Sequence, residues 1–302
     1  MVHSMGNSNQ PPRDWLRAAR QYVTSATRTE QIDTDQVGLH VLLGASVFLI
    51  VFPIIVAAVV STKPQGVMTS LGDLLPGGHA VENYRTAMVE FNFGQFLWNS
   101  FLMSLVIVVG KLTLSLLAAM AIVYYRVPYK DLVFLFILFT LMLPVPVRFV
   151  PLFELINDLG WGNTLLAITV PYLASATTVF ILRQHFLSMS GSIVETAKLD
   201  GVGPIRFLLY VLIPMSRGVL VGVSIIMFIY AWNQFLWPLV IIDSEANQVA
   251  QVGLSLLEGD VQSGGVAWAM VMTGSMLTLL PPLVLLLIFR KPLLKTFTIQ
   301  QK

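Results

Sequence analysis

The stretch VETAKLDGVGPIRFLLYVLIP, residues 194–214, is a partly polar interruption between two long apolar runs. It carries Glu195 and then the acidic residue Asp200 directly before Gly201. Pro214 follows thirteen residues after that glycine. A chain with only a passive, lipid-facing role has no need of such a segment. We therefore interpret it as a contact site for a protein outside the membrane.

Apolar residues dominate the chain around this stretch. Hydrophobic residues make up 56% of its 302 residues and charged residues only 11%, with a mean hydropathy of +0.76. A soluble domain of this length could not keep so much apolar surface from water, so the composition predicts a polytopic membrane protein. We expect its fold to be all-α. The chain has no cysteine, which excludes disulfides, thiolate metal sites and a cysteine nucleophile.

The number of membrane spans follows from the lengths of the apolar runs. A spanning helix needs roughly 20 apolar residues, and six stretches meet this requirement. They are residues 38–61, 97–125, 131–151, 161–182, 218–242 and 266–289. Prolines interrupt the third, fourth and sixth stretches, which predicts kinks that face the interior of a helix bundle. The polar residues 1–37 contain apolar residues at helical spacing over 13–32, typical of a surface helix, although an unstructured tail fits equally well.

The distribution of basic residues predicts that both termini are cytoplasmic. With this orientation only Lys63, Arg85 and Arg148 lie outside, and Lys111 lies within a span. All the other basic residues then lie on the cytoplasmic side; they are Arg13, Arg17, Arg20, Arg28, Arg126, Lys130, Arg183, Lys198, Arg206, Arg217, Arg290, Lys291, Lys295 and Lys302. Residues 194–214 are therefore expected on the cytoplasmic side.

The interrupting stretch itself predicts two short helices at an angle. Ser192 and Glu195 have the spacing of a capping box, and Gly201 is suited to the left-handed conformation that ends a helix. A second helix can begin at Pro204 and is broken by Pro214. Its apolar positions are Ile205, Phe207, Leu208, Leu209, Val211 and Leu212. Such a shape fits a groove of another protein, and an ordinary interfacial connector is the alternative.

The array of Glu195, Ala197, Asp200, Gly201 and Ile213–Pro214 resembles the EAA loop of membrane subunits of bacterial and archaeal ABC importers. The chain departs from that motif at two positions. These are Thr196, in place of the second-position alanine, and Val202, in place of the alanine that usually follows the glycine. Neither change removes the glycine turn, so we expect coupling to survive.

Four further segments narrow the resemblance. They are GKLTLSLLAAMAIVYYR (110–126), FTLMLPVPVRFVPLFELI (139–156), ASATTVFILRQHF (174–186) and FIYAWNQFLWPLVII (228–242). These segments look like the second membrane subunit of carbohydrate-type importers. Within that group they look most like the membrane subunit of sn-glycerol-3-phosphate importers, and the maltose and trehalose permeases are similar in less detail. The resemblance implies a type I ABC importer permease fold over residues 38–290, with a cytoplasmic segment at 1–37, a coupling loop at 187–217 and a cytoplasmic tail at 291–302.

The same resemblance implies the partners. It implies a second permease subunit in a heterodimer, an ATPase dimer that holds ATP and Mg²⁺, and an external solute-binding protein. The chain itself would bind no cofactor and catalyse no reaction, in keeping with the absence of a GxxxxGK[ST] phosphate loop from the sequence. We expect a bacterial or archaeal plasma membrane as its location, and no nucleic-acid partner.

Polar residues within the spans are candidates for the translocation path, because ionisable groups there are costly. Lys111 could face an anionic solute, or it could pair with a carboxylate of the partner subunit. Arg148 suits a phosphate, and an ion pair with Glu154 is the alternative. A polar-aromatic cluster in the fifth stretch comprises Tyr230, Trp232, Asn233, Gln234 and Trp237; it could line the path, or hold the two permease subunits together.

Two other classes of protein compete with an importer subunit. An ion-coupled secondary transporter would use Lys111 as a coupling charge and would be expected to have related halves, but no repeat is evident in this sequence. An integral membrane enzyme would need a polar catalytic cluster, and none is apparent. Among solutes, glycerol 3-phosphate is the first expectation and a di- or oligosaccharide the second.

Overall fold

The computed structural model describes residues 34–64, 75–259 and 268–298, and within these the chain forms helices and no β-strand. The chain divides into two compact parts, residues 1–55 and 56–302. The described portion of the first part is helix α2 (Thr34–Val60) up to Ile55. This helix is apolar on all sides, as expected of a helix surrounded by lipid or protein. The surface helix predicted over 13–32 lies outside the described residues.

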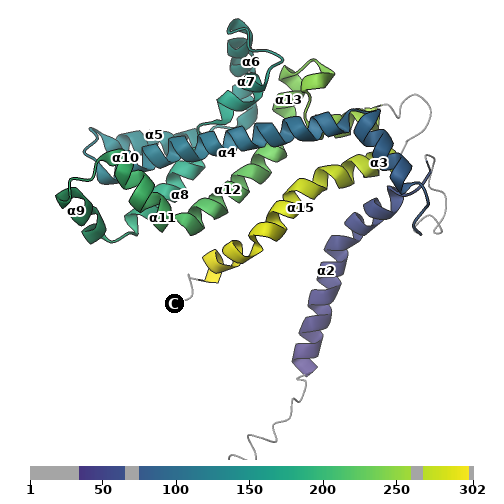
Figure 1. Cartoon of the computed structure of the whole chain (residues 1–302), viewed down its shortest axis with the longest axis horizontal. Helices are drawn as coiled ribbons and strands as arrows, with labels where there is room; N and C mark the ends of the chain where they lie inside the picture. The colour runs from purple at the N-terminus through teal and green to yellow at the C-terminus, as the bar shows by residue number, and fades with distance from the viewer. Residues whose placement is uncertain (1–33, 65–74, 260–267, 299–302) are drawn as a thin grey trace, which may run out of the picture. The chain divides into compact units, whose positions relative to one another are not determined.

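The second part is organised around one long helix, α4 (Phe93–Tyr124). Helices α8 and α12 pack along it, α15 packs against α12, and α5 packs against α8 (Figure 1). The bounds of the longer helices are α3 (Ala80–Val89), α5 (Lys130–Met142), α6 (Phe149–Asp158), α8 (Ala176–Leu187), α12 (Arg217–Trp232), α14 (Ala250–Gly259) and α15 (Trp268–Thr298). The shorter elements are η2 (Val145–Arg148), α7 (Leu165–Thr169), η3 (Val170–Tyr172), α9 (Gly191–Leu199), α10 (Pro204–Phe207), η4 (Leu208–Leu212), α11 (Ile213–Met215), α13 (Leu236–Ile241) and η5 (Glu245–Asn247).

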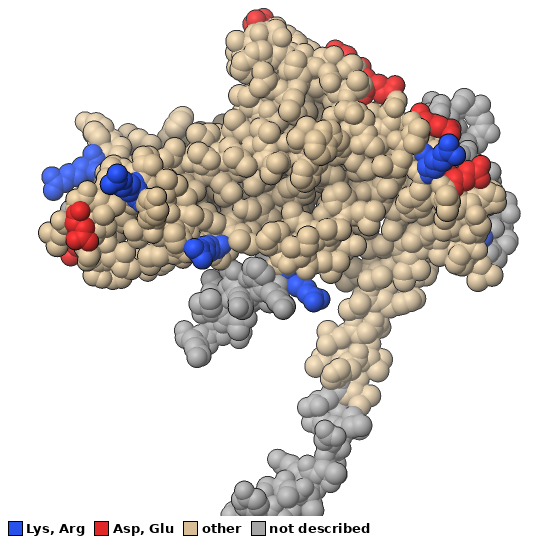
Figure 2. All heavy atoms as spheres, viewed as in Figure 1, with Lys and Arg blue, Asp and Glu red and all other residues tan. Residues whose placement is uncertain are grey.

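Most of the visible surface over the long helices is uncharged, and charged side chains gather toward its edges (Figure 2). Many apolar side chains on these helices are exposed, including Leu105 and Val109 on α4 and Ile226 on α12. In water such a surface would be a large unfavourable apolar patch. The surface therefore suits a lipid bilayer or a second membrane subunit.

The prediction of six spans is not confirmed. Among the described residues, three helices are long and apolar enough to cross a membrane, or up to five if each bent pair counts as one span. The pairs are α7–η3 with α8, bent by 40°, and α10–α11 with α12, bent by 85°. The predicted stretch 131–151 fails because α5 has only 13 residues before the chain turns into η2 and α6.

Prolines explain most of these breaks. Pro144 follows the end of α5, and Pro171 coincides with the change from α7 to the 3₁₀ turn η3. Proline removes the N–H that would bond to the carbonyl four residues earlier. In contrast, α15 continues unbroken through Pro281 and Pro282, so a proline does not by itself end a helix in this chain.

Two tryptophans supply donors to two of these freed carbonyls. Trp237 donates its indole N–H to the Ala167 carbonyl at 2.9 Å, and Ala167 lies four residues before Pro171. Trp232 donates to the Thr278 carbonyl at 3.1 Å, and Thr278 lies four residues before Pro282. Both indoles are fully buried, where a bare carbonyl is costly because no water can reach it. The two tryptophans therefore join α12 and α13 to the two proline-containing segments.

This pairing predicts a double-mutant cycle. Trp237→Phe removes the donor to the Ala167 carbonyl and should lower stability by about 1–3 kcal/mol, measured by thermal or denaturant unfolding of the purified protein in detergent. Pro171→Ala supplies a backbone N–H four residues beyond Ala167, so the same Trp237 substitution should cost less in that background. Equal losses in both backgrounds would show that Trp237 stabilises by packing alone.

Candidate functional site

The residues predicted as a coupling loop form a two-helix segment between α8 and α12. Its first helix, α9, begins at Gly191, so Ser192 lies within the helix rather than capping it. The Ser192 hydroxyl lies 2.7 Å from the Ser190 hydroxyl, and the Ser192 carbonyl accepts from Thr196. The predicted Ser192–Glu195 capping box is therefore wrong, because the helix starts two residues earlier than the sequence pattern indicates.

The glycine turn is present as predicted. Gly201 has φ +67°, in the left-handed region that favours glycine. The Val202 N–H donates to the Ala197 carbonyl at 3.0 Å, the long-range bond of a Schellman helix ending. Ala197 is buried, whereas Glu195 and Asp200 are exposed. The turn thus directs the two carboxylates away from the packed side of the loop.

The second half of the loop begins with Pro204 in the first turn of α10, as predicted. The chain then widens into the single π turn η4 before Pro214, a local adjustment typical of a helix that accommodates proline. An 85° bend separates this half from α12. Ile213 and Pro214 are partly buried in α11, immediately before the bend.

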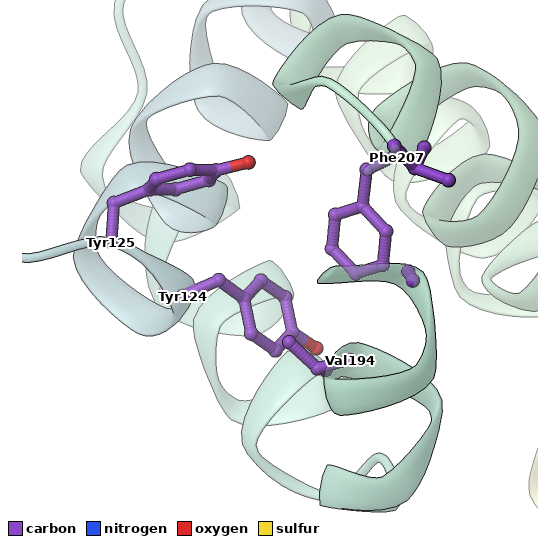
Figure 3. A pocket seen from close by; sticks show the side chains of 6 residues that line it. Tyr124, Tyr125, Val194 and Phe207 are labelled. Carbon is purple, nitrogen blue, oxygen red and sulfur yellow. The ribbon is translucent and has the colours of Figure 1, made fainter. Parts of the chain in front are cut away.

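The loop rests on the C-terminal end of α4. Phe207, Leu208 and Leu212 pack with residues of α4 and α8, and the Tyr124 ring meets Phe207 edge-on. Figure 3 shows Tyr124, Tyr125, Val194 and Phe207 around a small hollow of about 20 Å³ between α4 and the loop. The contact is therefore largely aromatic, and a displacement of the loop would press directly on the end of α4.

A second, larger cavity of about 560 Å³ lies farther along α4. Three predicted path residues line it, namely Lys111 from α4, Arg148 from η2 and Tyr230 from α12. Tyr172 and Thr177 also line it and were not among the predicted site residues. In the sequence they are polar residues that follow Pro171. The proline indicates a helix break, but it does not indicate which side chains face the cavity.

Lys111 is buried, with only 5% of the residue exposed. Its ammonium lies 4.4 Å from the centroid of the Tyr230 ring and 3.9 Å from the Met227 sulfur. Both contacts are only weakly polar. A cation–π contact stabilises an ammonium by about 0.5–2 kcal/mol. Within the described ranges no carboxylate forms an ion pair with it.

Arg148 is exposed at the end of η2. The ion pair with Glu154, the alternative to a path role, is not formed in the part of the chain that the structure describes. The guanidinium is therefore available to a group that enters the cavity.

The other members of the predicted polar-aromatic cluster do not line this cavity. Trp232 and Trp237 are buried and bond to backbone carbonyls. Asn233 is exposed, and its side chain bonds to the Ile229 carbonyl and to Gln251. Gln234 is partly buried beside it. Of this cluster, only Tyr230 is among the residues that line the cavity. Trp232 points to α15 instead, and the other three residues follow the end of α12.

No group of three or more His, Asp or Glu side chains within the described ranges is arranged to hold a metal ion.

Comparison with known proteins identifies the family. The profile of the family described as binding-protein-dependent transport system inner membrane component matches residues 111–292. This match includes the coupling loop and all the residues that line the large cavity. The chain belongs to this family. It is a permease subunit of a binding-protein-dependent ABC importer, with the helical permease fold of that family.

Curated relatives are similar over most of their length. The chain is 39% identical over 262 residues to the sn-glycerol-3-phosphate transport system permease protein UgpE of Pectobacterium atrosepticum, covering 83% of this chain and 92% of the relative. It is 37% identical over 272 residues to UgpE of Escherichia coli, covering 87% and 96%. It is 36% identical over 261 residues to UgpE of Brucella melitensis, covering 83% and 92%. All three relatives are named as transport permease proteins.

Solved structures agree on the fold. A chain from the crystal structure of a bacterial ABC transporter involved in the import of the acidic polysaccharide alginate matches with a TM-score of 0.75 at 22% identity, over 87% of this chain and 97% of that one. A second match has a TM-score of 0.60 at 13% identity, over 92% and 96%; it is the bacterial alginate ABC transporter in complex with an alginate pentasaccharide-bound periplasmic protein.

The absence of native cysteine permits a direct test of the cavity. Thr177 is exposed and lines the cavity, whereas its neighbour Thr178 is fully buried and bonded to Ser175. A membrane-impermeant thiol reagent, applied to the purified protein, should label Thr177→Cys and leave Thr178→Cys almost unlabelled. Equal labelling of both variants would contradict the cavity as described.

Proposed function

We propose that this chain forms half of the solute path of an ATP-driven importer for glycerol 3-phosphate, and that the segment 191–214 couples the path to an ATPase subunit. The observation that carries the coupling role is the loop's unpartnered apolar surface. Leu199 is 88% exposed and Tyr210 76%, and Ile205 and Leu209 are also exposed. On a segment expected outside the membrane, large exposed apolar side chains mark a surface that another protein covers.

The geometry of the loop supports transmission of a movement. Its packed side holds Ala197, Phe207 and Leu212 against α4 and α8, and its exposed side presents Glu195 and the apolar residues above. A partner bound to the exposed side would therefore move the loop as a unit against the end of α4. The loop also leads directly into α12 beyond the bend, so α12 would move with it.

The proposed mechanism is alternating access. ATP binding closes the ATPase dimer and pulls the loop, which rocks α4 and α12 and opens the path toward an external binding protein. ATP hydrolysis and product release return the path to the opposite orientation. In this scheme the chain binds no cofactor itself, since ATP and Mg²⁺ are held by the partner ATPase, and it performs no catalysis.

Partners and topology complete the proposal. A second permease subunit would form the other half of the path, and an external solute-binding protein would deliver the solute. The basic residues favour cytoplasmic termini and a cytoplasmic coupling loop in a bacterial or archaeal plasma membrane. The names of the curated relatives support glycerol 3-phosphate as the solute, and a sugar is the alternative.

Gly201 provides the sharpest test of the coupling role. A Cβ at this position would meet nothing within 4 Å, so a substitution acts through the left-handed backbone and not through a clash within the chain. Gly201→Val should strain the turn, since a left-handed non-glycine residue costs roughly 1–2 kcal/mol and a β-branched one more. Uptake and ATPase stimulation by the loaded binding protein should then fall while membrane insertion is retained.

Gly201→Asn is the matched control, because asparagine tolerates the left-handed conformation. It should retain most of the coupling activity that Gly201→Val loses. Wild-type uptake and ATPase stimulation in the valine variant would refute the coupling role. Equal loss in both variants would instead locate the defect in the fit of the added side chain to the ATPase.

A further inference from the structure

The large cavity has an unbalanced charge. Lys111 and Arg148 are its two charged lining residues, and no carboxylate lines it among the described residues. Its polar lining consists of hydroxyl groups, including those of Tyr172, Thr177 and Tyr230. The cavity therefore offers two cations and several hydrogen-bond donors to whatever enters it.

Lys111 requires an anion more than Arg148 does. A buried ammonium is costly unless it is paired, and at membrane depth the expense is greater than at a protein surface. The Tyr230 ring and the Met227 sulfur offset only part of it. A single carboxylate from a partner subunit could neutralise Lys111, but it would leave the second cation of the same cavity unbalanced.

We propose that Lys111 and Arg148 together form the anion-selecting site of this half of the path, with the Tyr230 ring packed against the Lys111 ammonium. The ligand class is a small phosphate monoester, whose dianion matches two cations. Arg148 would hold phosphate oxygens with its guanidinium fork, and Lys111 would act as a point charge. This assignment rests on the proposed function for its solute, but the electrostatic character of the cavity can be tested without any solute.

The position of Tyr230 gives the site a link to the transport cycle. Lys111 belongs to α4, whereas Tyr230 and Met227 belong to α12, the helix that follows the coupling loop. A movement of α12 relative to α4 would therefore change how far Tyr230 covers the ammonium. Anion binding and loop movement would then be coupled through one ring.

The first experiment measures the charge of the cavity directly in the complete reconstituted importer. Thr177→Cys is reacted with a negatively charged and with a positively charged methanethiosulfonate reagent, and the ratio of the two labelling rates is determined. Removing one nearby cation through Lys111→Met or Arg148→Gln should lower the ratio of anionic to cationic labelling by about tenfold. Lys130→Met, at the start of α5 and outside the cavity lining, should leave the ratio unchanged.

The second experiment measures uptake of labelled glycerol 3-phosphate and ATPase stimulation by the loaded binding protein. Lys111→Met should lower uptake at least about tenfold while ATPase stimulation is retained, and Lys111→Arg should restore most of the uptake. Glycerol 3-phosphate, but not glycerol, should slow labelling of Thr177→Cys.

Three outcomes would overturn the proposal. One is a labelling ratio that neither Lys111→Met nor Arg148→Gln changes. Another is a parallel loss of assembly, ATPase stimulation and uptake in Lys111→Met while Arg148→Gln transports normally, as expected if Lys111 pairs with a partner's carboxylate. The third is normal uptake in both variants. Absence of ATP-dependent uptake by the wild-type complex would contradict the proposed function instead, and the labelling ratio would still decide the charge of the site.

Discussion

Buried backbone carbonyls that lack their helical donors are the constraint on which the arrangement of this protein depends. In a membrane no water can satisfy them, so each must find a donor within the protein. Trp237 donates a hydrogen bond to the Ala167 carbonyl that Pro171 leaves free, and Trp232 donates one to the Thr278 carbonyl that Pro282 leaves free. Because both indoles flank the break between α12 and α13, these two bonds tie the break to α7 on one side and to α15 on the other.

The cavity follows from this arrangement. With α12 held at its C-terminal end, Tyr230 lies over Lys111 on α4, and the break at Pro171 places Tyr172 and Thr177 on the same cavity. At its other end α12 meets the coupling loop through an 85° bend. One helix thus connects the loop that an ATPase would move with the ring that covers the buried cation.

Local backbone chemistry was predictable from the sequence where one residue type decides it. Gly201 adopts the left-handed conformation, and Pro204 stands in the first turn of α10, because few other residues suit those positions. The start of α9 was missed, because the capping-box pattern pointed to Ser192 whereas the helix begins at Gly191. The count of six spans was not confirmed, in part because the third apolar stretch does not form one long helix. Hydropathy measures the apolar length of residues 131–151 but not the turn after Met142.

The residues of the cavity could be predicted in part, because polar side chains are rare in apolar stretches. Lys111, Arg148 and Tyr230 stood out as polar groups in apolar stretches, and all three line the cavity. Trp232 and Trp237 stood out equally, yet their polar atoms serve distant carbonyls that no local pattern reveals. Tyr172 and Thr177 were missed because the break at Pro171 decides which way they face. A sequence pattern therefore identifies a polar group in the membrane more readily than the partner that this group serves.

Whether an ATPase subunit covers the exposed side of the coupling loop is the question on which the account depends most. The direct measurement is cross-linking from single cysteines to a co-expressed ATPase subunit in membrane vesicles, with Leu199→Cys on the loop and Tyr129→Cys, also highly exposed, at the start of α5 as the control. The account predicts an efficient cross-link from Leu199→Cys that changes on addition of ATP, and little from Tyr129→Cys. No cross-link from Leu199→Cys, together with full uptake by the chain without any ATPase subunit, would contradict it.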